Sequence, residues 1–311
     1  MRICVSCRRL LRADASRCPH DGGAAEAVDT LPAGARLGAY RIERVLGEGG
    51  MGFVYEATHE VLHRRAAIKM LRPELASHAA IVTRFLNEAK AVNVINHQNI
   101  VNVYDYGDND DGGVYFVMEF LEGETLAARG ARARFAWPTA LAIGRQIAGA
   151  LAAAHTKSIV HRDLKPENVF LVRDPEVPSG ERIKLLDFGV AKLAADPISS
   201  ASVTRTGAVI GTPTYMSPEQ CRGVSVDHRA DLYAVGCILV ELCTGRPPFV
   251  GEGAGDVLTA HVHLPPPSLG SLGVNVPAGV ERLIARLLTK PVADRVQSAA
   301  ELIRLIDALD R

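Results

Sequence analysis

The chain has little of several features that would assign a protein to a class at once. Among its 311 residues, 35 Lys and Arg balance 35 Asp and Glu, so the formal net charge is zero. Proteins that bind nucleic acid through a broad basic surface need an excess of positive charge, so we expect no nucleic-acid partner. The length is enough for a sizeable core in one large domain or two smaller ones.

Long hydrophobic runs are also missing. A membrane-spanning helix needs roughly 18 or more apolar residues without charge. The best apolar run, Leu232 to Leu242, is shorter and contains Glu241, so it predicts a buried helix and no membrane span. The N-terminal residues, in which arginines are mixed with cysteines, lack the apolar stretch of a secretory signal, and we expect a cytoplasmic location.

Cysteine is scarce, with six residues in two groups. Cys221, Cys237 and Cys243 are scattered, and the last two lie in or beside the apolar segment, where a cysteine packs as a small hydrophobe. A reducing compartment disfavours disulfides, so these three need no special role. The remaining three cysteines cluster near the N-terminus.

Composition divides the chain into segments. Residues 1–23 hold the cysteine cluster, and 24–39 are rich in Ala, with Gly, Asp and Pro among them and no periodicity, which predicts a linker. Short strand patterns, with one helix at 79–93, predict a strand-rich small lobe at 40–119. A mostly helical large lobe is expected at 123–311, with helices at 138–157, 228–243, 277–289 and 298–309. The fold class expected is therefore α+β.

A glycine-rich turn lies between two strand patterns of the small lobe. The stretch Gly47-Glu48-Gly49-Gly50-Met51-Gly52-Phe53-Val54 fits Gly-x-Gly-x-x-Gly-x-Val, in which missing side chains let backbone N–H groups approach phosphates. An ordinary hairpin is the alternative. A dinucleotide-binding turn would lead into a helix, whereas the residues that follow are strand-like. The nucleotide contacts expected here are Gly47, Glu48, Gly49, Gly50, Gly52 and Val54.

Further nucleotide contacts are expected downstream of this turn. Lys69 ends an apolar strand pattern and would place its ammonium on the α- and β-phosphates, with Glu88 on the next helix as its partner. A strand-end lysine is otherwise usually solvated. Between the lobes the backbone would meet the adenine edge. The residues expected around the base are Ala67, Met118, Glu119 and Leu121.

A polar stretch in the large lobe has the composition of a phosphoryl-transfer site. In His161-Arg162-Asp163, the carboxylate of Asp163 would accept or orient the proton of a substrate hydroxyl. Asn168, five residues later, and Asp187, after an apolar run, offer the oxygen ligands that Mg²⁺ prefers. Either aspartate by itself would also suit a turn or a helix cap.

Three phrases in this order carry a family resemblance: His161-Arg162-Asp163-Leu164-Lys165-Pro166-Glu167-Asn168, Asp187-Phe188-Gly189 and Ser217-Pro218-Glu219. Residues 40–311 resemble the bacterial eukaryotic-type (Hanks-type) serine/threonine protein kinases. The resemblance implies a bilobal kinase fold, with an antiparallel sheet and one main helix in the small lobe. It also implies transfer of the ATP γ-phosphate, with Mg²⁺ or Mn²⁺, to Ser or Thr hydroxyls of protein substrates.

The same resemblance assigns roles to single residues of the large lobe. Lys165 stands where the family has a lysine near the transferred phosphate. Thr212 stands where the family has a threonine that completes the Ser/Thr substrate site. Glu219 and Arg295 match a buried ion pair beneath the substrate platform. Asp231 matches the family's helix-capping aspartate, which lies beneath the catalytic loop.

Control by phosphorylation is expected between the second and third phrases. Thr204 and Thr206 lie there, in a stretch crowded with hydroxyl residues. Phosphothreonine adds about two negative charges and would pair with Arg162 through charge-assisted hydrogen bonds. We expect autophosphorylation at both threonines, with self-association for transfer in trans. A polar loop that is merely solvated is the alternative.

The N-terminal cysteines have the spacing of a small zinc ribbon. Cys4-x-x-Cys7 is followed, after ten residues, by Cys18-Pro19-His20-Asp21-Gly22. Such ribbons commonly have a fourth cysteine, where this chain has Asp21 with His20 beside it, and either side chain would coordinate Zn²⁺. So short a segment needs a metal to fold. A tail with three spare thiols is the alternative.

Two other classes of function compete with a protein kinase. A pseudokinase would act as a nucleotide-binding module or scaffold, but all the catalytic residue types of the family are present. The second is a small-molecule phosphotransferase, which has a related site. Lys165, Thr212 and the Ser217-Pro218-Glu219 phrase favour protein substrates over small molecules.

Overall fold

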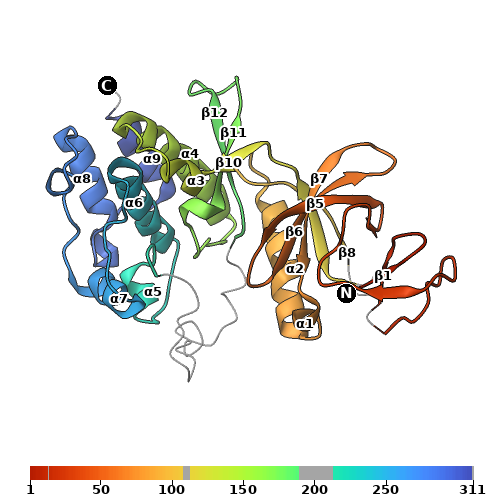
Figure 1. The fold of residues 1–311 in the computed structure, drawn as a ribbon. Coiled ribbons are helices and arrows are strands. Elements are labelled where there is room, and N and C mark those ends of the chain that lie inside the picture. Colours follow the sequence, from red (N-terminus) through yellow and green to blue (C-terminus); the bar gives the residue numbers. More distant parts are fainter. Residues whose placement is uncertain (13, 108–112, 189–212, 310–311) are drawn as a thin grey trace. The chain divides into compact units, whose positions relative to one another are not determined.

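The computed structural model describes residues 1–12, 14–107, 113–188 and 213–309. They belong to two compact units, Met1–Asn93 with Val101–Leu121, and Val94–Ile100 with Glu122–Arg311. Strands dominate the first unit and helices the second (Figure 1). This division agrees with the strand-rich and helical parts expected from the sequence.

The first unit is built on a six-stranded sheet in the order β4-β5-β6-β7-β9-β8, with antiparallel neighbours throughout. One face of the sheet forms the main core of the unit, where Ile42, Tyr55 and Ile68 are fully buried. The strands are β4 (Arg36–Leu37), β5 (Tyr40–Glu48), β6 (Gly52–His59), β7 (Arg65–Leu71), β8 (Val103–Gly107) and β9 (Tyr115–Glu119).

The other face of this sheet is covered by α2 (Ala79–Ile95), which follows the short α1 (Pro73–Ala76) (Figure 1). Phe85 and Ala89, four residues apart on one helix face, are buried against Phe116 of β9. The Phe85 and Phe116 ring centroids are 4.9 Å apart. The helix predicted at 79–93 is thus confirmed, and it continues to Ile95.

The N-terminal segment forms a second sheet in the order β2-β1-β3, from β1 (Arg2–Cys4), β2 (Leu10–Leu11) and β3 (Ala25–Ala27). Here the structure differs from the linker predicted at 24–39. Leu31, Ala35 and Leu37 are almost completely buried in the same core as the six-stranded sheet. Periodicity could not reveal this packing, because irregular turns, rather than one regular element, bring these side chains to the core.

The second unit surrounds α6 (Arg229–Thr244), which contacts α4 (Trp137–Thr156) and α8 (Ala278–Leu287). The apolar run predicted as a buried helix is the centre of α6. Glycines allow close approach to it: a Cβ added at Gly236 would lie 2.9 Å from Leu287 Cβ. With α9 (Ala299–Asp307) beside α4, all four helices predicted in this part are confirmed.

Several short elements of the second unit were not predicted. They are a three-stranded sheet, β10 (Gly123–Thr125), β11 (Val169–Arg173) and β12 (Glu181–Leu185), and the helices α3 (Leu126–Gly130), α5 (Pro218–Cys221) and α7 (Ala254–His263). Elements this short depend on tertiary packing more than on local propensity. In the part of the chain that the structure describes, no helix is both long and apolar enough to span a membrane.

Candidate functional site

The glycine-rich turn joins β5 to β6 in the first unit. Gly49 N donates to Gly52 O at 2.8 Å, and a Cβ at Gly52 would lie only 1.9 Å from Met70 O of β7. Gly52 is therefore required by packing, whereas Gly47 and Gly50 have open space around them. Because a strand follows the turn, the dinucleotide-binding alternative is wrong. The bare backbone of the turn suits close approach of an anion.

Lys69 of β7 is not a solvated strand-end lysine. Its Nζ lies 3.0 Å from Glu88 Oε1 of α2, and both side chains are largely buried. The predicted pairing is confirmed. The contact holds an ammonium group near the sheet end that carries the glycine-rich turn, since Lys69 pairs in register with Val54 of β6.

The residues predicted around an adenine base lie in β7, in β9 and just after β9 of the same sheet. Ala67 of β7 and Met118 of β9 are register partners, and Ala67 is buried. Glu119 Oε1 accepts a hydrogen bond from Asn102 N at 2.7 Å, and Glu119 N donates to Asn102 O. The first unit ends at Leu121, two residues beyond β9.

In the second unit, Asp231 of α6 holds the loop that carries the catalytic phrase. Its carboxylate accepts hydrogen bonds from His161 N at 2.9 Å and from Arg162 N at 2.8 Å. Arg162 has a φ of 61°, a left-handed conformation that is unfavourable for a residue with a Cβ. Two bonds to a carboxylate offset this strain. The predicted place of Asp231 beneath this loop is confirmed, but its carboxylate binds the loop and does not cap α6, whose N-cap residue is His228.

His161 connects this loop to the stretch that contains Asp187. Its ring is completely buried, 4.7 Å from the Phe188 ring, and Nε2 lies 3.3 Å from Leu186 O. Burial lowers the pKa of His161, which keeps the imidazole neutral at physiological pH. A neutral ring that donates through Nε2 fits this contact with a carbonyl.

The loop brings together the polar groups predicted from the sequence. Asn168 Nδ2 donates to Asp163 O at 2.9 Å, and Lys165 Nζ lies 3.4 Å from Asp163 Oδ2. Leu186 N donates to Asn168 O at 2.8 Å, so the residue before Asp187 is bound to the same loop. Asp187 has a φ of 44°. Non-glycine residues in this conformation are found often at functional sites.

One residue that sequence reasoning missed supports this loop from α5. Gln220 Nε2 donates to Arg162 O at 2.9 Å, while its Oε1 accepts from Ser217 N at 3.0 Å. The second contact is half of a capping box at the start of α5. Ser-x-x-Gln was visible in the sequence as a capping signal, but the partner Arg162 was not.

Beneath α5, the predicted ion pair between Glu219 and Arg295 is confirmed. The two carboxylate oxygens accept from Arg295 NH1 and NH2 at 2.8 Å and 3.0 Å, and the guanidinium is fully buried. Burial raises the pKa of Glu219, but the ion pair more than offsets this, and the net pKa lies below the usual value. Thr204, Thr206 and Thr212 lie outside the described residues.

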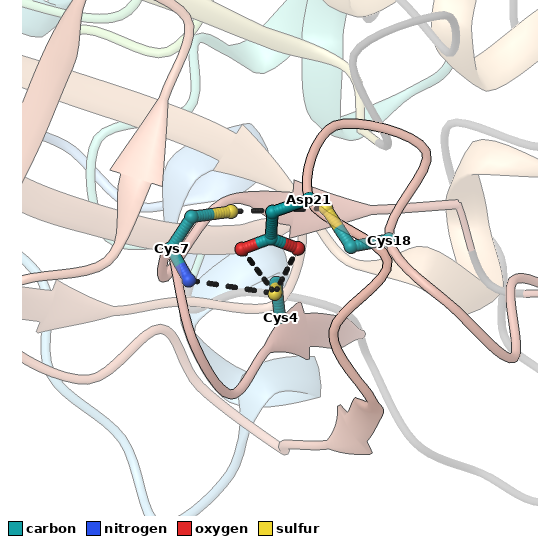
Figure 2. Close-up of side chains that lie close together, drawn as sticks. All are labelled: Cys4, Cys7, Cys18 and Asp21. Atoms are coloured by element: carbon teal, nitrogen blue, oxygen red, sulfur yellow. Dashed lines mark hydrogen bonds between the residues drawn. The ribbon is translucent and has the colours of Figure 1, made fainter.

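The N-terminal cysteines form a second candidate site, in the first unit (Figure 2). The ligand atoms of Cys4, Cys7, Cys18 and Asp21 all lie within 4.8 Å of one another. Cys7 and Cys18 Sγ are 3.7 Å apart, and Cys4 Sγ is 3.3 Å from Asp21 Oδ1. The structure thus brings Asp21 to the cysteines, and His20 is not in the group.

Local backbone structure shapes this cluster. Cys7 N and His20 N donate to the sulfurs of Cys4 and Cys18, each at 3.4 Å. A Cβ at Gly23 would lie 2.8 Å from Cys4 Sγ and 3.0 Å from Asp21 Oδ1, so only glycine fits there. The described cysteines are free thiols. The arrangement resembles paired metal knuckles.

Comparisons with known proteins agree with the fold and the loop geometry. The protein kinase domain model matches residues 40–303, and the chain therefore belongs to the protein kinase domain family. It is 43% identical over 307 residues to the serine/threonine-protein kinase Pkn1 of Myxococcus xanthus, covering 95% of this chain and 42% of that protein. It is 39% identical to PrkC of Bacillus subtilis, covering 85% and 39% respectively.

Solved structures support the same assignment. The crystal structure of the Mycobacterium tuberculosis PknI kinase domain matches with a TM-score of 0.68 and 29% identity, covering 90% of this chain and 99% of that one. The bilobal α+β kinase fold and the resemblance to bacterial serine/threonine kinases are confirmed. The chain spans half or less of the length of the curated relatives named first.

Proposed function

We propose that the protein is an ATP-dependent protein kinase that transfers the γ-phosphate of ATP to Ser or Thr hydroxyls of other proteins. The observation that carries the proposal is the single hydrogen-bonded loop that joins Asp163, Lys165 and Asn168 and reaches the residue before Asp187. A pseudokinase has no need to keep these groups together. The relatives named as serine/threonine kinases support the choice of acceptor.

The proposed chemistry assigns one task to each group. The acceptor oxygen forms a bond to the γ-phosphorus while the bond to the β,γ-bridging oxygen breaks, and ADP leaves. Asp163 takes the hydroxyl proton, and Lys165 lies beside it to balance the charge of the transferred phosphate. Lys69, fixed by Glu88, would bind the α- and β-phosphates, next to the backbone of the glycine-rich turn.

The donor set of the second unit fits a hard divalent cation. Asn168 uses Nδ2 to donate to Asp163 O, which leaves Oδ1 as its cation-binding atom, and Asp187 offers a carboxylate. Bound there, Mg²⁺, or Mn²⁺ in its place, would neutralise charge on the phosphates. A need for ATP also supports a cytoplasmic location.

The kinase proposal is tested by incubating the purified chain with labelled ATP and Mg²⁺ and a basic acceptor protein. We expect phosphate on Ser and Thr from the native chain, and a loss of about 100-fold or more in Asp163→Asn and Lys69→Met. Lys90→Met, at an exposed lysine of α2, is the matched control. A native chain that binds ATP but labels no protein would favour the pseudokinase alternative.

We further propose control by autophosphorylation at Thr204 and Thr206, by transfer between two copies. Arg162 supports this: among the described residues its buried Nε has no hydrogen-bond partner, so it suits a phosphate oxygen. Phosphopeptide mapping after incubation with ATP should find both threonines modified. Unmodified threonines in an active enzyme would refute this control.

At the N-terminus, we propose that Cys4, Cys7, Cys18 and Asp21 bind Zn²⁺. With Zn–S and Zn–O bonds of about 2.3 and 2.0 Å, tetrahedral geometry requires S···S and S···O separations of about 3.8 and 3.5 Å. The observed values are 3.7 Å for Cys7 and Cys18, and 3.3 and 3.6 Å from Cys4 to the two oxygens of Asp21. These separations, together with a spread of no more than 4.8 Å among the four ligand atoms, support the proposal.

The zinc proposal is tested by metal analysis of protein purified without chelator. One equivalent of zinc is expected, and it should be lost in Cys4→Ser with Cys7→Ser. Asp21→Ala should weaken binding about 10-fold or more, whereas His20→Ala is the matched control and should not. The opposite ranking of the two variants would assign the fourth ligand to His20.

A further inference from the structure

The cysteine cluster is not a separate module but shares a core with the nucleotide-binding sheet. Ile3 of β1 and Leu10 of β2 flank the metal ligands and are buried in one cluster with Tyr55, Met70 and Tyr115 of the six-stranded sheet. Because a residue in a close-packed core is sensitive to small displacements, the position of the N-terminal sheet affects the larger one.

A backbone contact leads from the second metal ligand to the edge of the larger sheet. Arg8, directly after Cys7, has a φ of 63°, and its carbonyl accepts from Arg36 N at 2.8 Å. Arg36 lies in β4, which pairs with the start of β5. β5 runs on to Gly47 and Glu48, so the knuckle supports the strand that enters the glycine-rich turn.

The strand that leaves the turn is supported from the same side. Tyr55 of β6 is fully buried, and its hydroxyl accepts a hydrogen bond from Leu31 N at 3.2 Å. Leu31 follows β3, whose Ala25 is the register partner of the metal ligand Cys4. Both strands that flank the glycine-rich turn therefore contact segments that are fixed beside the metal ligands.

The turns that carry the metal ligands have only a small core of their own. The strands of the N-terminal segment are two or three residues long, and the buried cluster around the ligands consists of Leu11 and of Cys4 and Cys18 themselves. Strands this short and a core this small do not fold by themselves, so the free energy of metal binding contributes directly to their folding. Loss of the metal would release the contacts of Arg8 and Leu31.

We propose that metal at Cys4, Cys7, Cys18 and Asp21 orders β4, β5 and β6 and thereby sets the affinity of the protein for ATP. The inference rests on the proposed zinc site. It makes the N-terminal knuckle a metal-dependent control of the nucleotide-binding strands rather than a docking module. The second unit has its own core around α6 and stays folded when the metal is removed.

The experiment compares hydrogen exchange of the full chain with zinc, after chelation in the presence of a thiol reductant, and after zinc is restored. Chelation should increase exchange of amides at 36–55 and leave those of α4 and α6 unchanged, and zinc should reverse the change. The affinity for a fluorescent ATP analogue should fall about 10-fold in parallel. Cys4→Ser with Cys7→Ser should match the chelated protein, with Cys221→Ser and Cys243→Ser as the control pair.

Each contrary result overturns a different statement. Faster exchange confined to residues 1–27, with ATP affinity unchanged, would refute the inference while the zinc site stands. Protein that holds no zinc and does not respond to chelation would refute both the site and the inference. Neither readout needs phosphoryl transfer, so an inactive enzyme would contradict the kinase proposal alone.

Discussion

At the scale of single residues, the ion pair between Glu219 and Arg295 is the most buried charged contact among the described ion pairs. A buried charge that loses its partner costs about 3–5 kcal/mol, whereas an exposed pair contributes about 1 kcal/mol or less. We therefore expect Glu219→Ala to reduce the free energy of unfolding by about 3–5 kcal/mol. Urea unfolding measures the loss.

The exposed pair between Arg286 and Glu301, with 2.6 Å between the charged atoms, is the matched control. Arg286→Ala, at the exposed end of this pair, should cost about 1 kcal/mol or less. Equal losses in the two variants would contradict the buried role. Since the ion pair lowers the pKa of Glu219 below its usual value, its contribution is complete above that usual value. It is lost as the pH falls through the lowered pKa of the folded state.

The site residues that could be predicted from the sequence are those that lie at fixed spacings within a motif. Lys69, Glu88, Asp163 and Asn168 lie at family distances, and the predicted contacts of Lys69 with Glu88 were found. Asp21 could not be chosen over His20, because neighbouring residues in a turn point in different directions. The choice depends on Gly23 and on Cys4 of β1, which is separated from Asp21 by 17 positions in the sequence.

At the scale of elements, α5 shows how a short helix acts on a loop far away in sequence. Gln220 both completes the capping box with Ser217 and holds the carbonyl of Arg162. Gln220→Glu retains the acceptor for Ser217 N but loses the donor to Arg162 O. We expect this variant to lower the phosphorylation rate about 10-fold, since loop position controls the geometry of transfer.

Ser217→Ala is the control, because it removes a cap contact but leaves Gln220 in place. It should lower the free energy of unfolding by about 1 kcal/mol and change the rate less than Gln220→Glu does. Steady-state kinetics and urea unfolding of both variants give the comparison. A larger rate loss in Ser217→Ala would mean that the helix, and not the contact with Arg162, positions the loop.

The long helices were predictable because their apolar residues recur with helical period, as in α2 and α4, or form a continuous apolar run, as in α6. The segment at 24–39 was not, because Leu31, Ala35 and Leu37 follow no period and are buried by contacts with a sheet that follows in sequence. The short sheet of β10, β11 and β12 was not predictable for a similar reason. Its strands become stable only when they pair across long separations in sequence.

At the scale of the whole molecule, we expect the stability of the fold to change with pH in the alkaline range because of Lys290. Burial lowers the pKa of this lysine to about 8 from its ordinary 10.5, with Nζ 4.1 Å from the centroid of the Phe249 ring. Between pH 8 and 10.5 the unfolded chain therefore binds more protons at this group than the folded chain. The free energy of unfolding gains a contribution that rises with pH across this window.

Lys290→Met removes that contribution and retains the apolar stem. Between pH 7.5 and 9.5 the free energy of unfolding of the native chain should rise by about 1 kcal/mol relative to that of the variant. This value allows for the screening of a partly exposed charge. Urea unfolding of both proteins at several pH values measures the gain. A difference that stays constant with pH would show that Lys290 remains charged in the folded protein.

The sequence by itself determined the family, the α+β class and the polar residues that the proposed phosphoryl transfer would use, because these depend on residue types at short, fixed separations. Tertiary structure decided which groups meet across long separations. It placed Gln220 against Arg162, Asp21 with the three cysteines, and the N-terminal segment in the core of the six-stranded sheet. The physical reason is that local patterns specify elements, whereas packing and hydrogen bonding between distant elements fix where side chains point.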